Sequence, residues 1–338
     1  MTLQPGFDIT EAIELLEICA ILNGKKIKGD PEKTVPPLKI PPNTVPEKLP
    51  QPQNWEPIYE LPETSPPYYN YFEIWKHKTI PNRYVVGVRG TIHATGSIIE
   101  DVRALTIPAT DKKGNLYIRR PYQFAADPRA TVHIGFSTGL MSIIHNIVTQ
   151  MQKISSSEGG THEWFITGHS QGAAVATLCR SYLQYQPLPG VENISYKTYV
   201  FAQPKPGDTY YGYDYEKITY DYASRSSMGF RVTNTYDWVP QVPLSIQRLK
   251  DLSTPNPLTV YNPFHFRNIG VNPLLNLLMV LLEKLNILTT LDYVGCGTPI
   301  ILPGTPSENT VDPKDFFWQH HTNMYYKLLT EQFGVRNY

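Results

Sequence analysis

The chain has 338 residues, of which 41% are hydrophobic and 18% charged, a balance that excludes disordered and membrane-spanning classes and predicts one large domain with additions. Thirty basic and thirty acidic residues give a net charge of zero without a basic stripe, so nucleic acid is not an expected partner. The three cysteines are Cys19, Cys179 and Cys296; their odd number and wide spacing predict neither a disulfide framework nor a metal site.

The N-terminus lacks the cationic start and continuous apolar run of a secretory signal. The longest apolar stretch, Pro273 to Leu282, is too short to cross a bilayer. We therefore expect no transmembrane segment, and a location in the cytoplasm or at the surface of a membrane. Secretion would require a signal removed before residue 1.

An amphipathic helix is the first predicted element. Asp8 and Glu11 have the spacing of a capping box, and apolar residues recur at helical intervals as far as Asn23. A proline-dense stretch from Pro31 to Pro67 then predicts an extended connection. We interpret it as a strap on the domain surface, with a docking site for a partner as the alternative.

Strand-like and helix-like runs alternate beyond the strap, which predicts an α/β fold with a mainly parallel sheet. The predicted strands are Tyr69–Trp75, Tyr84–Val88, Glu163–Thr167, Thr198–Ala202 and Phe230–Asn234. The predicted helices are Ser137 to about Ile154 and Gln171 to about Tyr185. A leucine-rich segment from Ile269 to Leu291 is too apolar for a narrow stripe, so it predicts a buried helix or, alternatively, an apolar cap.

The pentapeptide Gly168-His169-Ser170-Gln171-Gly172 matches G-x-S-x-G and lies between a predicted strand and a predicted helix. In such a nucleophile elbow the serine occupies a strained turn, and flanking glycines let neighbouring backbone pass. A serine hydroxyl also needs a histidine base that is oriented by a carboxylate. Ser170 is therefore the candidate nucleophile of an α/β hydrolase.

The acid and the base of such an enzyme follow the serine along the chain. Asp237 comes directly after a predicted strand end and is favoured over Asp208 and Asp214, which lie in a tyrosine-rich polar segment. The histidines beyond it are His265, His320 and His321. The first of these lies between two phenylalanines and fits a packed strand better than a catalytic base.

Five motifs occur in the order and spacing of the class 3, or fungal-type, lipases. They are Arg89-Gly90-Thr91, Val132-His133-Ile134-Gly135-Phe136, the elbow at 168–172, Phe201-Ala202-Gln203-Pro204-Lys205-Pro206-Gly207 and Asn234-Thr235-Tyr236-Asp237-Trp238-Val239-Pro240. The chain thus resembles this family over about residues 69 to 330. The resemblance implies the α/β-hydrolase fold, a mostly parallel central sheet flanked by helices, and a catalytic role for Asp237.

The same resemblance implies a base that opens a helix carrying a tyrosine shortly afterwards. His321, followed by Tyr325 and Tyr326, fits that pattern best, and His320 is the alternative base. The oxyanion of the tetrahedral intermediate would be held by Gln171, next to the nucleophile, and by Thr91, after Arg-Gly.

Three further features follow from the family pattern. His133 and His169 resemble structural histidines of the family. The lid would lie between Thr91 and Arg103, where Ile92 to Ile99 offers apolar side chains, although the tryptophan often found in the lid is absent.

We therefore expect a serine carboxylic-ester hydrolase that acts on lipid esters as a triacylglycerol lipase does, through an acyl-enzyme and without metal or cofactor. Residues 69–338 would form the catalytic domain, and residues 1–68 the N-terminal helix and strap. A phospholipase A1 or galactolipase is the alternative within the family, and a catalytically inactive interaction module is the alternative from another class. The expected partner is a lipid ester at a membrane or droplet surface.

Overall fold

The computed structural model describes residues 3–30, 39–65, 69–90, 105–157, 159–189, 191, 193–243 and 292–334. A seven-stranded sheet in the order β1-β2-β3-β8-β9-β13-β15 forms its centre. These strands are β1 (Trp55–Glu60), β2 (Phe72–His77), β3 (Arg83–Val88), β8 (His162–His169), β9 (Ile194–Phe201), β13 (Gly229–Asn234) and β15 (Thr298–Leu302). The strands from β3 to β15 are parallel, and the first two pair antiparallel at one edge.

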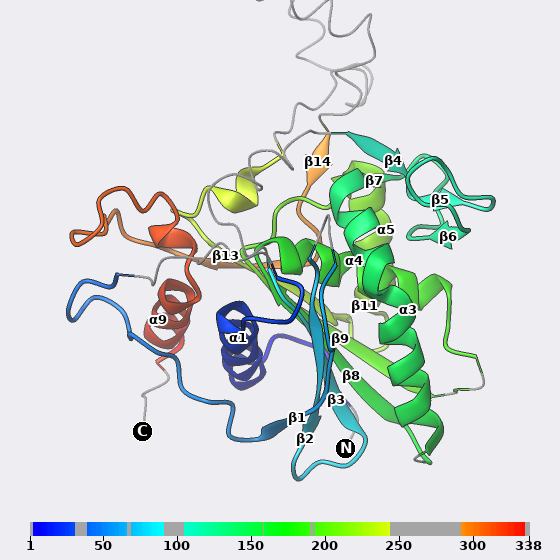
Figure 1. Cartoon of the computed structure of the whole chain (residues 1–338), viewed down its shortest axis with the longest axis horizontal. Helices are drawn as coiled ribbons and strands as arrows, with labels where there is room; N and C mark the ends of the chain where they lie inside the picture. Colours follow the sequence, from blue (N-terminus) through cyan, green and yellow to red (C-terminus); the bar gives the residue numbers. More distant parts are fainter. Residues whose placement is uncertain are drawn as a thin grey trace, which may run out of the picture.

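Helices cover both faces of this sheet (Figure 1). They are α1 (Ile9–Gly24), α3 (Ile134–Ser157), α4 (Gln171–Tyr185), α5 (Thr209–Thr219) and α9 (Thr322–Phe333). α1 and α9 pack together on one face, whereas α3 and α4 lie on the other. The predicted α/β architecture with a mainly parallel sheet is therefore confirmed.

A second, smaller sheet lies beside α5 and α3 in the order β14-β10-β7-β4. Its strands are β4 (Thr106–Pro108), β7 (Thr131–His133), β10 (Gly207–Asp208) and β14 (Tyr293–Val294). Two short antiparallel pairs complete the described strands: β5 (Thr110–Asp111) with β6 (Tyr122–Gln123), and β11 (Tyr220–Asp221) with β12 (Ser226–Ser227). None of these short strands was predicted from the sequence.

The N-terminal segment is part of the core. α1 begins after Asp8, whose carboxylate accepts the backbone N–H groups of Thr10 and Glu11, as the capping pattern predicted. Its apolar side chains Leu16 and Leu22 are fully buried against the sheet. Within the stretch interpreted as a strap, residues 55–60 form β1 and extend the sheet.

Several sequence predictions lie outside the described residues: the lid at Ile92 to Ile99, the leucine-rich segment, His265 and Thr91. Among the helices that the structure describes, none combines the length and apolarity needed to cross a bilayer. The three cysteines are buried free thiols.

Candidate active site

Ser170 lies in a strained turn between β8 and α4. Its φ of 60° and ψ of −133° fall outside the regions that L-residues ordinarily occupy. Glycines make the turn feasible: a Cβ on Gly168 would lie 2.3 Å from the carbonyl oxygen of Gly172, and one on Gly172 would lie 2.4 Å from that of Val88. This turn is the nucleophile elbow that the pentapeptide predicted.

His320 connects the serine to a carboxylate. Its Nε2 lies 2.8 Å from Oγ of Ser170, and its Nδ1 lies 2.8 Å from Oδ2 of Asp237. Asp237 follows the end of β13, and His320 ends the short 3-10 helix η4 (Trp318–His320). All three residues are more than nine-tenths buried. The arrangement has the geometry of a serine nucleophile, a histidine base and an orienting acid.

The predicted base His321 does not take part in this arrangement, and that expectation is corrected. Its Nε2 bonds Asp315 at 2.9 Å, and its backbone carbonyl accepts the N–H groups of Met324 and Tyr325 at the start of α9. Consecutive side chains leave the backbone in different directions. His321 is the N-cap residue of α9, and its ring bonds Asp315 instead of Ser170. The residue that faces Ser170 is the alternative base, His320.

Asp237 is held by a full set of donors. Its Oδ2 accepts the hydroxyl of Tyr325 at 2.7 Å in addition to the imidazole, and its Oδ1 accepts the backbone N–H of Val239 at 2.9 Å. Burial, followed by the charge of Asp237, raises the pKa of Tyr325 well above its usual range, so this phenol stays protonated and donates. The carboxylate is therefore fixed in one orientation toward His320.

The histidine of the elbow contacts the base loop. Nε2 of His169 lies 2.8 Å from the carbonyl oxygen of His320, and the two rings lie 4.7 Å apart between centroids. Burial first, and then the neighbouring His320, hold the pKa of His169 well below its usual value. His169 is thus neutral. Sequence reasoning assigned it only to the scaffold and missed its partner Asn23, because nothing in the helical pattern of α1 marks an asparagine that reaches the elbow.

The remaining candidates are placed as follows. Gln171 opens α4 directly after Ser170, which puts its backbone N–H at the positive end of the helix. Asp208 caps α5 by accepting the N–H of Tyr211. Asp214 accepts the hydroxyl of Tyr185. Among the residues that the structure describes, neither rival carboxylate is bonded to a histidine.

His133 accepts the backbone N–H groups of Gly135 and Phe136 on its Nδ1 and stacks on the ring of Phe136. These contacts fix the start of α3 and give the side chain a structural part, as the family resemblance implied. In the described part of the chain, no cluster of three or more His, Cys, Asp or Glu side chains is arranged to hold a metal ion.

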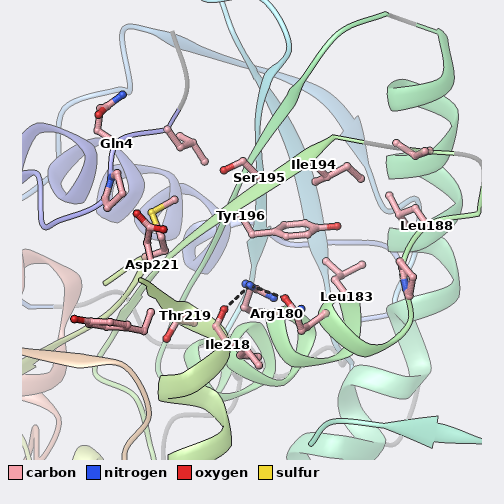
Figure 2. A pocket seen from close by; sticks show the side chains of 17 residues that line it. Gln4, Arg180, Leu183, Leu188, Ile194, Ser195, Tyr196, Ile218, Thr219 and Asp221 are labelled. Atoms are coloured by element: carbon pink, nitrogen blue, oxygen red, sulfur yellow. Dashed lines mark hydrogen bonds between the residues drawn. The ribbon is translucent and has the colours of Figure 1, made fainter. Parts of the chain in front are cut away.

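A pocket of about 660 Å³ lies at the amino end of β9, whereas Ser170 follows the carboxyl end of β8. Figure 2 shows Arg180 in its wall below Tyr196, with hydrogen bonds to Gln184 and to the carbonyl of Ile218. Ser170 precedes the first residue of α4, whereas Arg180 lies nine residues into that helix, a rise of about 14 Å. This pocket is therefore separate from the Ser170 site.

Comparison with known proteins points to one family. Residues 85–246 match the family model described as lipase (class 3). Over 111 residues the chain is 29% identical to the secreted mono- and diacylglycerol lipases A of Penicillium cyclopium and Penicillium camembertii, which covers 33% of this chain and 32% of each relative. The match thus spans about a third of the length of these curated relatives.

The structure is similar to that of the Lip2 lipase from Yarrowia lipolytica, with a TM-score of 0.50 and 18% identity over 72% of this chain and 77% of that chain. This likeness confirms the α/β-hydrolase fold. The matched residues 85–246 contain the elbow and Asp237, so this part of the chain is similar to the class 3 lipases where the candidate site lies.

Proposed function

We propose that this chain is a serine carboxylic-ester hydrolase that acts on lipid esters. One observation carries the proposal: a serine in a strained elbow, with Oγ 2.8 Å from Nε2 of His320, whose Nδ1 lies 2.8 Å from Asp237. The match of residues 85–246 to the class 3 lipase family model supports the same activity. An inactive interaction module would have no need of this buried, fully bonded set of three groups.

The first half of the reaction is acylation. Oγ of Ser170 attacks the ester carbonyl carbon while Nε2 of His320 takes the hydroxyl proton, and Asp237 stabilises the resulting imidazolium through Nδ1–H. The carbonyl oxygen becomes an oxyanion, for which we propose Gln171 and Thr91 as donors. When the C–O bond breaks, the imidazolium gives its proton to the departing alcohol, and an acyl-serine ester remains.

The second half is hydrolysis of that ester. A water molecule takes the place of the alcohol, His320 accepts one of its protons, and the hydroxide equivalent attacks the acyl carbon. Collapse of the second tetrahedral intermediate breaks the bond to Oγ, and the proton on Nε2 returns to Ser170. The products are a fatty acid and the free enzyme, and no external co-reactant other than water is needed.

The substrate we propose is an acylglycerol at a membrane or droplet surface. The two Penicillium relatives are named as mono- and diacylglycerol lipases, which favours these esters over phospholipids and galactolipids. We propose a location in the cytoplasm or at a membrane surface, although those relatives are named as secreted. Immunodetection of the protein in cell and medium fractions distinguishes a location in or on the cell from secretion.

The activity is tested with a fluorophosphonate probe and a panel of esters. We expect the probe to label wild-type protein at Ser170 and to leave Ser170→Ala unlabelled, with the same melting temperature for both. Hydrolysis of monoacyl-, diacyl- and triacylglycerols, phosphatidylcholine and galactolipids then ranks the substrates. A folded wild-type chain that neither reacts with the probe nor cleaves any ester would falsify the proposal, and preference for phosphatidylcholine or galactolipids would move it to the alternative within the family.

A further inference from the structure

Asn23, at the end of α1, bridges two backbone segments that meet at the elbow. Its Oδ1 accepts the backbone N–H of Gly90 at 3.2 Å, and its Nδ2 lies 3.2 Å from Nδ1 of His169. Gly90 follows β3 and is the last described residue before Thr91. One amide side chain therefore contacts both the segment that leads to the proposed oxyanion donor and the residue that precedes the nucleophile.

The direction of every hydrogen bond in this bridge is determined. The carbonyl oxygen of His320 can only accept, so Nε2 of His169 carries the proton. Because His169 is neutral, its Nδ1 has a lone pair and accepts a hydrogen from Nδ2 of Asn23. That leaves Oδ1 of Asn23 to accept the N–H of Gly90. The side-chain amide of Asn23 thus supplies a hydrogen-bond donor to His169 and a hydrogen-bond acceptor to Gly90 at the same time.

Further hydrogen bonds hold the two backbone segments that Asn23 connects. Arg89, next to Gly90, donates two bonds to the carboxylate of Asp30 and one to the carbonyl of Tyr69. The carbonyl of His320, at the other end, belongs to the residue whose ring contacts Ser170. The contacts thus connect two rigid parts of the active site through α1.

We propose that Asn23 is a positioning residue for ester hydrolysis, which holds His169 in its Nε2–H tautomer and thereby fixes the backbone of His320 and Gly90 around Ser170. This inference rests on the proposed hydrolase function. It also gives α1, which lies outside the segment matched to the lipase family, a part in the reaction.

The charge state of His169 matters because its ring lies 4.7 Å from that of His320. A proton on Nδ1 of His169 would place a positive charge beside the base and oppose formation of the imidazolium that acylation requires. The other titratable groups that face this pair are Asp237 and Tyr325, which bond one another, and His321. By offering a donor to Nδ1, Asn23 disfavours that second proton.

The test compares Asn23→Ala, Asn23→Asp and Asn23→Gln in the full chain. Asn23→Ala loses both bonds, and we expect kcat to fall about tenfold with KM within twofold, because an interaction worth roughly one hydrogen bond is lost from the transition-state geometry. Asn23→Gln keeps a donor and an acceptor and should recover most of kcat. Asn54→Ala is the matched control, since Asn54 also links α1 to a neighbouring segment but bonds Glu14; it should leave kcat unchanged.

Asn23→Asp provides the readout that a purely structural role would not affect. Its carboxylate offers only acceptors to His169, so Nδ1 takes up a proton and the ring of His169 places a positive charge beside His320. The acidic limb of the kcat/KM profile should therefore move to lower pH, and the 15N resonances of the His169 ring should change from the neutral to the protonated pattern.

Two results separate this inference from the function on which it rests. Suppose that the wild type hydrolyses ester normally, that kcat of all three variants lies within twofold of the wild-type value, and that their pH profiles are unchanged. That result would overturn the role of Asn23 and leave the hydrolase function intact. Absence of hydrolysis by the wild type would overturn both, and unchanged 15N resonances of His169 in Asn23→Ala would show that the bridge itself does not set the tautomer.

Discussion

His320 and His321 differ in what their side chains touch, although they are adjacent in the chain. His320 bonds Ser170 and Asp237 and is 6% exposed, whereas His321 is half-buried and pairs with Asp315 near the surface. Only the first imidazole can carry a proton between a serine and a substrate. The two residues therefore make a matched pair for mutagenesis.

We predict that His320→Ala lowers kcat by about three to four orders of magnitude, on the scale seen when a triad member is removed. His321→Ala should lower kcat by less than about fivefold, because it loses one partly exposed hydrogen bond to Asp315 and keeps the backbone of the helix cap. Steady-state kinetics on a soluble ester, with melting temperatures as the folding control, measure both. The opposite ranking would return the base to His321.

The sequence could not predict which of these two histidines faces Ser170. The elbow pattern specified Ser170, because strained turns of that type need glycines at fixed spacing. Asp237 followed from a strand end. Which of the two histidines faces Ser170, however, depends on the backbone conformation where η4 meets α9, and two consecutive histidines carry no local signal of that conformation.

Elements with a strong local signal were predicted closely. α4 has the predicted bounds, and α1 begins after the predicted cap residue. β15 was missed because its sequence, Thr298-Pro299-Ile300-Ile301-Leu302, includes a proline, which is tolerated where the strand lies at the edge of the sheet. α5 was missed because its tyrosine-rich sequence was interpreted as a polar segment, whereas Tyr211 and Tyr215 are buried.

The interface between α1 and α9 contains a buried acid, Glu17, which is 6% exposed. Burial, with a smaller contribution from the charge of Glu14, raises the pKa of Glu17 from 4.5 to about 7. A carboxyl group whose pKa is higher in the folded than in the unfolded chain favours folding fully below pH 4.5. That contribution is lost as the pH rises through about 7.

We predict that Glu17→Gln increases the free energy of unfolding by about 3 kcal/mol at pH 8 and leaves it nearly unchanged at pH 4, because the amide stays neutral at both values. Urea denaturation of wild type and variant at the two pH values gives the difference directly. Glu331→Gln, on the exposed surface of α9, is the control and should show no pH-dependent difference. An equal effect of Glu17→Gln at pH 4 and pH 8 would mean that the pKa of this acid is the same in the folded and the unfolded chain.

At the scale of the whole molecule, the N-terminal 68 residues and the rest of the chain share one core. In the described ranges, three ion pairs join the two parts: Lys25 with Glu73, Asp30 with Arg89, and Glu11 with Lys197. The partners on the catalytic side are almost without solvent exposure, at 0%, 1% and 1% of their side chains. Each would lose its partner if the N-terminal part were removed.

The apolar surfaces agree with the ion pairs. Leu22 on α1 packs so closely on β3 that a Cβ on Gly87 would lie 2.7 Å from its Cδ1. β1 covers the edge of β2, whose backbone groups would otherwise be open to pairing with another chain. Residue 68 separates the N-terminal helix and the proline-dense stretch from the alternating strands and helices. The contacts across that position nevertheless favour a single folding unit.

We predict that a chain of residues 69–338 does not fold on its own. Truncation removes three ion pairs and exposes an apolar sheet face to water, and we expect the combined loss to be comparable to the roughly 5–15 kcal/mol that stabilises a typical domain. The truncated chain should precipitate, or bind a hydrophobic dye and melt without a cooperative transition, whereas the full chain melts cooperatively and hydrolyses ester. Co-expression of residues 1–68 as a separate chain should restore part of the soluble, active protein, because it returns α1, β1 and the three partners. Cooperative melting and ester hydrolysis by residues 69–338 alone would instead establish the C-terminal part as an independent catalytic domain and would also remove Asn23 from the list of residues needed for the reaction.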